Sequence, residues 1–329
     1  MKPFSTARAT GVHDALHQIS TAPDARFVAG GTNLIDLMKY GVEAPSRIVD
    51  ITQLPLGRIE ETPDGGLRIG ALARNSDMAA HPLIRTRYPL LSEAILAGAS
   101  AQLRNAATAG GNLMQRTRCY YFYDIAFTQC NKRNPGSGCA ALDGFNRIHA
   151  ILGASEQCIA TNPSDMNVAL AALDALIRVE GPSGVRVIPI GEFHRLPGDT
   201  PQIDTNLKPG ELITSIHLPP VTGNPRSHYL KVRDRNSYAF ALVSVAAWMK
   251  IDGGNIIDAR IALGGVAHKP WRVPEAENLL KGKPPGEAAY RAAADAIVQG
   301  ARTYPNNAFK VELAKRSVVR ALTTAEARS

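Results

Sequence analysis

Hydrophobic and polar positions change their spacing several times within the first 56 residues. Helical spacing occurs in two places, at Val12, Leu16 and Ile19 and again over residues 34–40. Short apolar runs of the kind that form buried strands occur in two others, at residues 26–29 and 47–51. Because helix and strand patterns alternate, we predict a small α/β unit over residues 1–56.

Residues 57–220 combine several strand patterns with helical ones. Strands are predicted at residues 67–70, 177–180, 186–190 and 212–218. One helix is predicted around residues 90–96. A second begins after a polar cap, Ser164 or Asp165, and its apolar face comprises Met166, Leu170, Leu173 and Leu176. Between these two helices, residues 114–163 show almost no periodicity. We therefore predict a mixed α+β unit that carries an irregular insertion.

Residues 219–225 contain prolines and a glycine that neither a helix nor a strand can continue, and they are the best linker in the chain. Strand patterns follow at residues 228–233, 239–250 and 256–263. Helical patterns then begin at Pro274, Gly286 and Asn307. This order predicts a smaller C-terminal α/β domain over residues 226–329, and an α+β class for the chain as a whole.

Composition narrows the class of protein. With 45% hydrophobic and 20% charged residues, the chain is typical of a folded globular protein. The net charge is +8, but Lys and Arg are mixed with acids along the chain, so we expect no nucleic-acid partner. The chain has no run of about 18 apolar residues for membrane insertion. Since its first residues lack the apolar core of a secretory signal, we expect the chain to stay in the cytoplasm when it is made alone.

Two stretches contain paired glycines. In Phe27 to Leu34, an apolar strand ends in Gly30-Gly31 and a helix begins, so backbone N–H groups there are free to approach a phosphate. In Leu103 to Leu113, Gly110-Gly111 again predicts consecutive exposed backbone donors, beside the hydroxyl of Thr108 and the amide of Asn112. Each stretch alone also fits a tight turn with no ligand. Two such loops in one chain suit a ligand with two phosphates.

These motifs resemble those of a known family, the FAD-binding medium subunits of molybdenum hydroxylases, which are relatives of xanthine dehydrogenase, carbon monoxide dehydrogenase and aldehyde oxidoreductases. The resemblance covers nearly the whole chain and rests on five motifs in the family's order. They are Ala29 to Leu34, Ile69-Gly70-Ala71, Arg104 to Leu113, Ser164-Asp165, and Lys231-Val232-Arg233 with Ala262 to Ala267 before Pro270 and Arg272. The resemblance implies a two-part FAD-binding domain followed by a C-terminal domain of the carbon monoxide dehydrogenase flavoprotein type.

The resemblance also implies which residues hold FAD. In the family the two glycine loops grip the pyrophosphate, an aspartate helps to hold the flavin portion, and a lysine approaches the isoalloxazine ring. A cation there would stabilise the negative charge of reduced flavin. The matching residues in this sequence are Arg26, Phe27, Val28, Ala29, Gly30, Gly31, Thr32, Asn33, Leu34, Thr108, Gly110, Gly111, Asn112, Leu113, Asp165 and Lys231. His268, which follows the last glycine motif, is expected to have a surface or packing role.

All four cysteines of the chain lie within forty residues of one another, inside the insertion. Three explanations remain open from the residues alone: disulfides, a structural zinc site and an iron–sulfur cluster. Disulfides require an oxidising compartment, and zinc prefers closely paired cysteines, whereas these are separated by ten, eight and eighteen residues. An iron–sulfur cluster tolerates dispersed ligands, and the nearby arginines and lysines would offset its negative charge. The cysteines are Cys119, Cys130, Cys139 and Cys158.

The insertion resembles that of periplasmic aldehyde oxidoreductases, whose flavin subunit carries an extra [4Fe–4S] cluster. The resemblance therefore implies one [4Fe–4S] cluster on the four cysteines, with a mainly structural task and electron transfer as an alternative. It further implies a heterotrimer with a small [2Fe–2S] subunit and a large molybdenum-cofactor subunit. Electrons from an aldehyde would pass through the partners to FAD on this chain and then to an acceptor.

Export to the periplasm would depend on a signal carried by a partner. The aldehyde and the acceptor cannot be inferred from the sequence. A free-standing flavin oxidoreductase and a non-catalytic iron–sulfur scaffold are the alternative functions.

Overall fold

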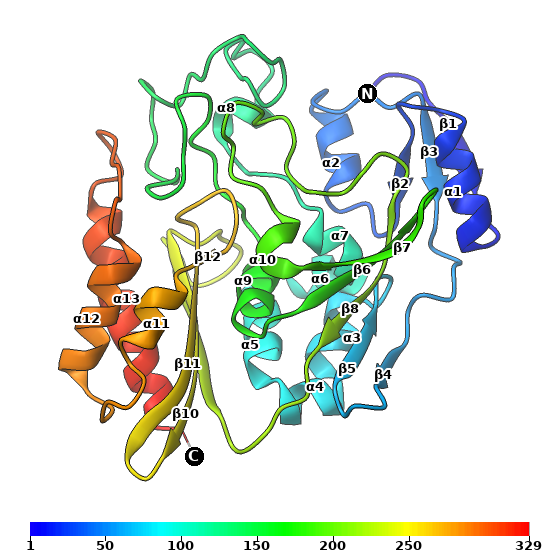
Figure 1. Cartoon of the computed structure of the whole chain (residues 1–329). Helices are drawn as coiled ribbons and strands as arrows, with labels where there is room; N and C mark the ends of the chain where they lie inside the picture. The colour runs from blue at the N-terminus through cyan, green and yellow to red at the C-terminus, as the bar shows by residue number, and fades with distance from the viewer. Residues whose placement is uncertain (329) are drawn as a thin grey trace.

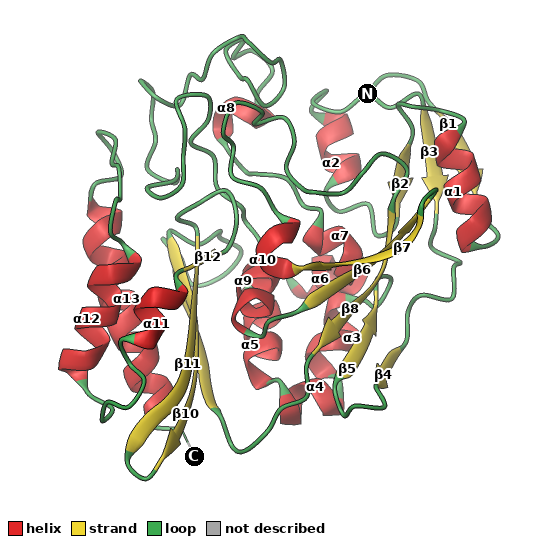
Figure 2. Ribbon diagram, in the orientation of Figure 1, coloured by secondary structure: helices red, strands yellow, loops and turns green. Residues whose placement is uncertain are grey.

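The computed structural model describes residues 1–328, which form three sheets, each with its own helices (Figures 1 and 2). The mixed α+β class predicted from the sequence is confirmed. The N-terminal sheet is parallel, as βαβ crossovers require, and has the order β1-β3-β2. Strand β1 (Ser5–Arg8) was not predicted. The other elements lie close to their predicted bounds: α1 (Val12–Ser20), β2 (Arg26–Val28), α2 (Leu34–Lys39) and β3 (Arg47–Asp50).

The second sheet is antiparallel and has the order β4-β5-β8-β6-β7. Its strands are β4 (Ile59–Glu61), β5 (Leu67–Gly70), β6 (Leu176–Gly181), β7 (Gly184–Pro189) and β8 (Leu212–Leu218), which confirms the four predicted ones. Most of the associated helices are short. They are α3 (Asn75–Ala80), α4 (Pro82–Arg87), α5 (Pro89–Ala97), α6 (Ala101–Ala106), α7 (Ala109–Leu113), α9 (Asp165–Ala172) and α10 (Ile190–Phe193).

Helix α9 begins where the sequence predicts and ends earlier. Ser164 caps it, because its Oγ accepts a hydrogen bond from the backbone N–H of Asn167 at 3.1 Å. Every residue of α9 is buried. A helix that is buried on all sides has no polar face, so its apolar residues do not mark its end. The predicted extension of the apolar face to Leu176 is therefore wrong, since Leu176 already starts β6.

The C-terminal sheet is antiparallel, with the order β12-β11-β10-β9. The strands are β9 (Arg226–Val232), β10 (Val243–Asp252), β11 (Asn255–Gly264) and β12 (Trp271–Arg272). The helices α11 (Pro274–Asn278), α12 (Glu287–Ile297) and α13 (Phe309–Glu326) follow them. The elements predicted here are confirmed, although β10 begins at Val243 and not at residue 239.

The alternate residues of strand β10 show that this sheet lies between two hydrophobic cores. Val245, Ala247 and Met249 belong to the core that includes residues of α12 and α13, whereas Ala246 and Trp248 belong to the core of the second unit. Both faces of the strand are therefore covered, which is why its sequence is an almost continuous apolar run without alternation. In Figure 1 the sheet stands between α12 and α13 on one side and α5 and α9 on the other. No helix within residues 1–328 is both long and apolar enough to cross a bilayer.

The insertion over residues 114–163 forms the loops at the top of Figure 1. Its one regular helix is α8 (Tyr120–Tyr123), and the rest consists of turns and isolated bridges. Its two ends lie together, because Ser164 Oγ donates a hydrogen bond to Asn112 Oδ1 at 2.7 Å. The chain thus leaves after α7 and returns directly before α9, as the sequence predicts for a segment that loops out.

Candidate functional site

A cavity of about 530 Å³ lies where the N-terminal unit, the second unit and the insertion meet, and we call it the cleft. Its size is in the range of cofactor pockets. Most of the predicted ligand residues line it. They are Arg26, Phe27, Val28, Ala29, Gly30, Gly31, Thr32, Asn33, Leu34, Thr108, Gly110, Gly111 and Leu113. Asn112, Asp165 and Lys231 are not among its lining residues.

The first glycine stretch, residues 30–33, joins β2 to α2 on the wall of the cleft. Gly31 has a φ of +71°, in the left-handed region that favours glycine. Gly30 packs against the end of α6, where an added Cβ would lie 1.9 Å from the Ala106 carbonyl oxygen. Within residues 1–328, none of the backbone N–H groups of this stretch donates a hydrogen bond. Consecutive free N–H groups beside a cavity form a concave site that favours an anion.

The second glycine stretch, residues 108–113, differs from the prediction. The N–H of Ala109 donates to the Ala73 carbonyl at 2.9 Å, and that of Gly110 donates to the Ala71 carbonyl at 2.7 Å. The N–H of Gly111 donates to Thr108 Oγ1 at 3.3 Å, because Thr108 caps the short helix α7. The prediction of consecutive exposed donors is therefore wrong here. The stretch offers the cleft a wall almost without side chains.

Asn112, Asp165 and Lys231 form contacts beside the cleft. The Asn112 amide oxygen accepts the Ser164 hydroxyl and so joins the two ends of the insertion. Lys231 Nζ lies 2.8 Å from Asp165 Oδ2, and both side chains are buried. The second carboxylate oxygen of Asp165 accepts a hydrogen bond from the Tyr229 hydroxyl at 2.8 Å. Asp165 borders a small hollow of about 20 Å³ that shares Thr161 and Asn162 with the cleft.

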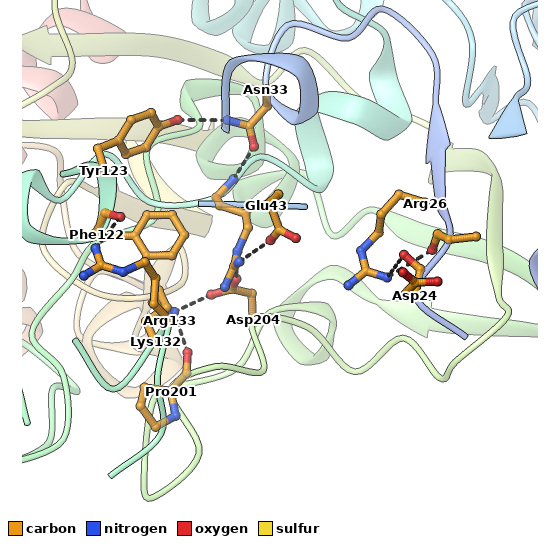
Figure 3. A network of polar contacts seen from close by, with 12 residues as sticks. Asp24, Arg26, Asn33, Glu43, Phe122, Tyr123, Lys132, Arg133, Pro201 and Asp204 are labelled. Atoms are coloured by element: carbon orange, nitrogen blue, oxygen red, sulfur yellow. Dashed lines mark hydrogen bonds and ion pairs between the residues drawn. The ribbon is translucent and has the colours of Figure 1, made fainter. Parts of the chain in front are cut away.

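The insertion is bound to the first glycine stretch by polar contacts (Figure 3). The Asn33 Oδ1 atom accepts the backbone N–H of Arg116 at 2.9 Å, and its Nδ2 donates to the Tyr123 hydroxyl at 3.2 Å. The Arg116 guanidinium contacts Glu43 at 2.6 Å and Asp204 at 2.8 Å. The rim of the cleft is therefore built in part by the insertion.

Asp204 is the centre of this network. It accepts hydrogen bonds from Arg116 and from Lys132, whose ammonium also donates to the Pro201 carbonyl at 2.6 Å. The Lys132 side chain is 1% exposed, so Asp204 neutralises a charge that water does not reach. Burial raises the pKa of Asp204, but the positive charges of Lys132 and Arg116 outweigh it and hold that pKa at about 2.

The four cysteines gather in one apolar cluster with Tyr121 and Phe122. All four are free thiols; Cys119, Cys130 and Cys158 are buried and Cys139 is half-buried. Cys130 and Cys139 face each other across an isolated antiparallel bridge. His149 Nε2 lies 3.1 Å from Cys119 Sγ. Among residues 1–328, however, no three or more Cys, His, Asp or Glu side chains stand in a metal-binding arrangement.

The basic residues of the insertion already have partners of their own. Arg118 contacts Asp36 at 2.8 Å, and Arg147 contacts Asp234 at 2.7 Å. Arg133 donates to the backbone carbonyls of Tyr121 and Phe122. Together with the Lys132 and Arg116 contacts to Asp204, these pairs show that the positive charge mainly fixes the insertion. The sequence interpretation, in which it offsets a cluster's charge, overlooked these carboxylates and carbonyls.

Sequence reasoning missed several polar side chains of the cleft, among them Asp204 and His268. His268 was expected to have a surface or packing role, but it lines the cleft and is 8% exposed. Both of its ring nitrogens lack a hydrogen-bond partner among the described residues. The position of His268 directly after a glycine motif was the one available signal.

Comparison with known proteins fits this geometry. Residues 2–221 match the family described as "FAD binding domain in molybdopterin dehydrogenase", and residues 228–325 match "CO dehydrogenase flavoprotein C-terminal domain". The aldehyde oxidoreductase FAD-binding subunit PaoB of Escherichia coli K12 is 51% identical over the full length of both chains. The glyceraldehyde dehydrogenase medium chain of Sulfolobus acidocaldarius is 30% identical over 85% of this chain and 82% of its own length.

Among solved structures, carbon monoxide dehydrogenase from Hydrogenophaga pseudoflava superposes with a TM-score of 0.78 at 26% identity. The match covers 99% of this chain and 98% of that one. The free N–H groups of the first glycine stretch, the size of the cleft and these matches agree with one another. The chain therefore belongs to the family of FAD-binding medium subunits of the molybdenum hydroxylases.

Proposed function

We propose that this chain is the FAD-binding electron-transfer subunit of a molybdenum-containing aldehyde oxidoreductase. We infer an aldehyde as the substrate class from one observation. The chain is 51% identical, over the whole of both chains, to the aldehyde oxidoreductase FAD-binding subunit of Escherichia coli. Its partners are a small [2Fe–2S] subunit and a large molybdenum-cofactor subunit in a heterotrimer. Bound FAD supplies two-electron storage between these one-electron partners and an external acceptor.

The residues of the cleft hold the cofactor in different ways. The free N–H groups of residues 30–33 bind the pyrophosphate, and Arg26 to Leu34 form the wall around it. Residues 108–113 let the cofactor approach closely, since Gly110 and Gly111 have no side chain. Asp165 and Lys231 remain proposed flavin residues. Their place beside the cleft means that the flavin reaches them only if its edge fits against the small hollow or if their ion pair opens.

A test of this function uses the purified complex and the isolated chain side by side. Adding an aldehyde to the complex without air bleaches the flavin absorbance, whereas the isolated chain with FAD stays oxidised. The second result follows because this chain offers no site for the aldehyde in the proposed mechanism. Rapid bleaching of the isolated chain would instead favour a free-standing flavin oxidoreductase.

We further propose that Cys119, Cys130, Cys139 and Cys158 hold one [4Fe–4S] cluster. The supporting observation is that all four thiols meet in one apolar cluster, although they are far apart in sequence. The thiols have to rearrange locally, because the described residues show no metal-binding arrangement. Such a crosslink would hold the insertion against the cleft.

Iron and acid-labile sulfide analysis of the purified complex tests this cluster. The expected result is about four of each per chain. Serine at any one of the four positions is expected to lower iron content and FAD occupancy together. One zinc without sulfide would support the structural zinc site, and a cluster without FAD would support the scaffold alternative.

We also propose that the complex is exported to the periplasm on a signal carried by a partner subunit. Cell fractionation compares co-expression with all partners against expression of this chain alone. We expect periplasmic protein only in the first case.

A further inference from the structure

His268 lies in the turn between β11 and β12, and this turn is held from several sides. The Val266 carbonyl accepts the N–H of Ile151 at 2.9 Å, and the Ala267 carbonyl accepts the N–H of Asn162 at 3.0 Å. Lys310, which is fully buried, donates to the Gly265 carbonyl and to the His149 carbonyl at 2.8 Å. The imidazole is therefore presented to the cleft by a fixed backbone.

The two ring nitrogens of His268 form no hydrogen bonds with the rest of residues 1–328. The side chain is 8% exposed. A buried polar group without a partner costs about 1–3 kcal/mol, so such groups are rare unless a ligand satisfies them. Its neighbour on the cleft wall, His194, differs in this respect, because its Nε2 already lies 2.9 Å from the Leu113 carbonyl.

The imidazole of His268 is neutral at physiological pH. Burial lowers its pKa to about 3, and the positive charge of Lys132 acts in the same direction. A neutral imidazole offers one N–H donor and one acceptor nitrogen. Near it, Thr161 and Asn162 add uncharged polar groups to the cleft. This part of the wall suits ring carbonyls, ring nitrogens and hydroxyl groups, whereas the free N–H groups of residues 30–33 suit a pyrophosphate.

We propose that His268 is a binding residue of the cofactor that donates a hydrogen bond to the flavin half of FAD, either to the isoalloxazine ring or to the ribityl chain. The proposal rests on FAD occupying the cleft. It assigns a role to a side chain outside all the motifs matched to FAD. It also adds a second side chain of the C-terminal domain, besides Lys231, to those proposed to contact the cofactor.

The test compares three variants of the full chain after FAD removal: His268→Leu, which removes both nitrogens, His268→Gln, which restores a donor, and His13→Leu, which changes an exposed histidine on α1. Two probes are titrated, FAD and ADP, since ADP carries the pyrophosphate and adenine without the flavin. We expect His268→Leu to weaken FAD binding by about tenfold, the equivalent of one hydrogen bond. ADP binding stays unchanged, His268→Gln recovers part of the FAD affinity, and His13→Leu behaves as the wild type.

A spectroscopic readout separates this role from a structural one. In the wild type, the ¹⁵N resonances of the His268 ring are expected to shift when FAD binds and to stay in place when ADP binds. This measurement needs no variant, so it shows whether the His268 ring contacts the flavin half of FAD even if His268→Leu does not fold. Unchanged ring resonances with FAD, or an equal loss of FAD and ADP affinity in His268→Leu, would overturn the proposal. Failure of the wild type to bind FAD at all would instead refute the assignment of the cleft.

Discussion

The two glycine stretches of the cleft have similar sequences and opposite hydrogen-bonding states. In Gly30-Gly31-Thr32-Asn33 the backbone N–H groups have no acceptor among residues 1–328. In Thr108 to Leu113 they donate to Ala73, Ala71 and Thr108, so the protein itself uses them. The first stretch can therefore bind an anion through its backbone. The second is a scaffold that keeps side chains away from the ligand.

The difference in hydrogen bonding depends on which backbone segment packs against each stretch. The second follows α6 and packs against the residues directly after β5, where the carbonyl groups of Ala71 and Ala73 accept two of its N–H groups. The first follows β2, and its N–H groups point to no strand or helix that could accept them. A paired-glycine motif therefore indicates a close approach of backbone, either to a ligand or to another part of the protein. Which of the two applies depends on the tertiary structure.

The largest expected effect comes from adding a methyl group to the first stretch. In Gly30→Ala the new Cβ would overlap the Ala106 carbonyl, so we expect destabilisation at or above the upper end of the range of about 1–3 kcal/mol known for overpacking. Gly110→Ala, whose Cβ would lie 3.2 Å from Ala71, is expected to cost less. Urea unfolding measures both, and Gly57→Ala, which meets no atom within 4 Å, is the control. Equal stability of all three variants would contradict the close packing of Gly30.

A smaller effect concerns Asp204, in the network that binds the insertion to the first glycine stretch. The folded pKa of Asp204, about 2, lies below the ordinary value of about 3.9 in an unfolded chain. The ionised carboxylate therefore stabilises the fold above pH 4 or so, by up to about 2 kcal/mol, and this contribution is lost as the pH falls toward about 2. Denaturant unfolding at several pH values measures it. The Asp204→Asn variant should lack this part of the acid dependence, and an identical profile in both proteins would refute the prediction.

Amide hydrogen exchange, measured with and without FAD, tests the free backbone N–H groups of the first glycine stretch. We expect FAD to slow the exchange of the amides of residues 30–33 by about tenfold or more, because they gain acceptors. The amides of residues 109–112 are already bonded in the apo chain and should change far less. A similar gain in both stretches would remove the distinction between them.

The smallest effect is expected at the cap of the second stretch. Thr108→Ala removes the acceptor of the Gly111 N–H and should cost about 1 kcal/mol in unfolding, whereas Thr108→Ser should retain most of the stability. Both variants should bind FAD fully at saturating concentration. Wild-type stability of Thr108→Ala combined with loss of FAD would mean that the hydroxyl serves the ligand and not the helix.

Much of the fold was predictable from local signals. Strand β5 was predicted at its observed bounds because it lies in a short apolar run after a glycine-rich segment. The start of α9 was predicted at a polar cap, Ser164 or Asp165, and Ser164 is the cap in the structure. The end of α9 was not predicted correctly, since a helix that is buried on all sides shows no hydrophobic periodicity. The start of β10 was also misjudged, because aromatic residues before Val243 continue an apolar pattern outside the strand.

The site was predictable only where it is continuous in sequence. Residues 26–34 line the cleft as expected, and their pattern is local. Asp204 and His268 were missed, because their partners or targets come from segments far away along the chain. The pairing of Asp165 with Lys231 was missed for the same reason: each residue was matched to the cofactor separately, and only the tertiary structure brings the two charges together.

The buried side chain of Lys310 has a consequence for the order in which the cleft is completed during synthesis. It fixes the turn that carries His268, yet it lies in α13, the most C-terminal helix within residues 1–328. During translation the N-terminal unit leaves the ribosome before α13 does, so this wall of the cleft has to wait until Lys310 has been added. A ribosome-bound chain that stops before residue 310 therefore has an incomplete cleft. The fold thereby ties the completion of this wall to the synthesis of α13, long after the glycine stretches of the same cleft have been made.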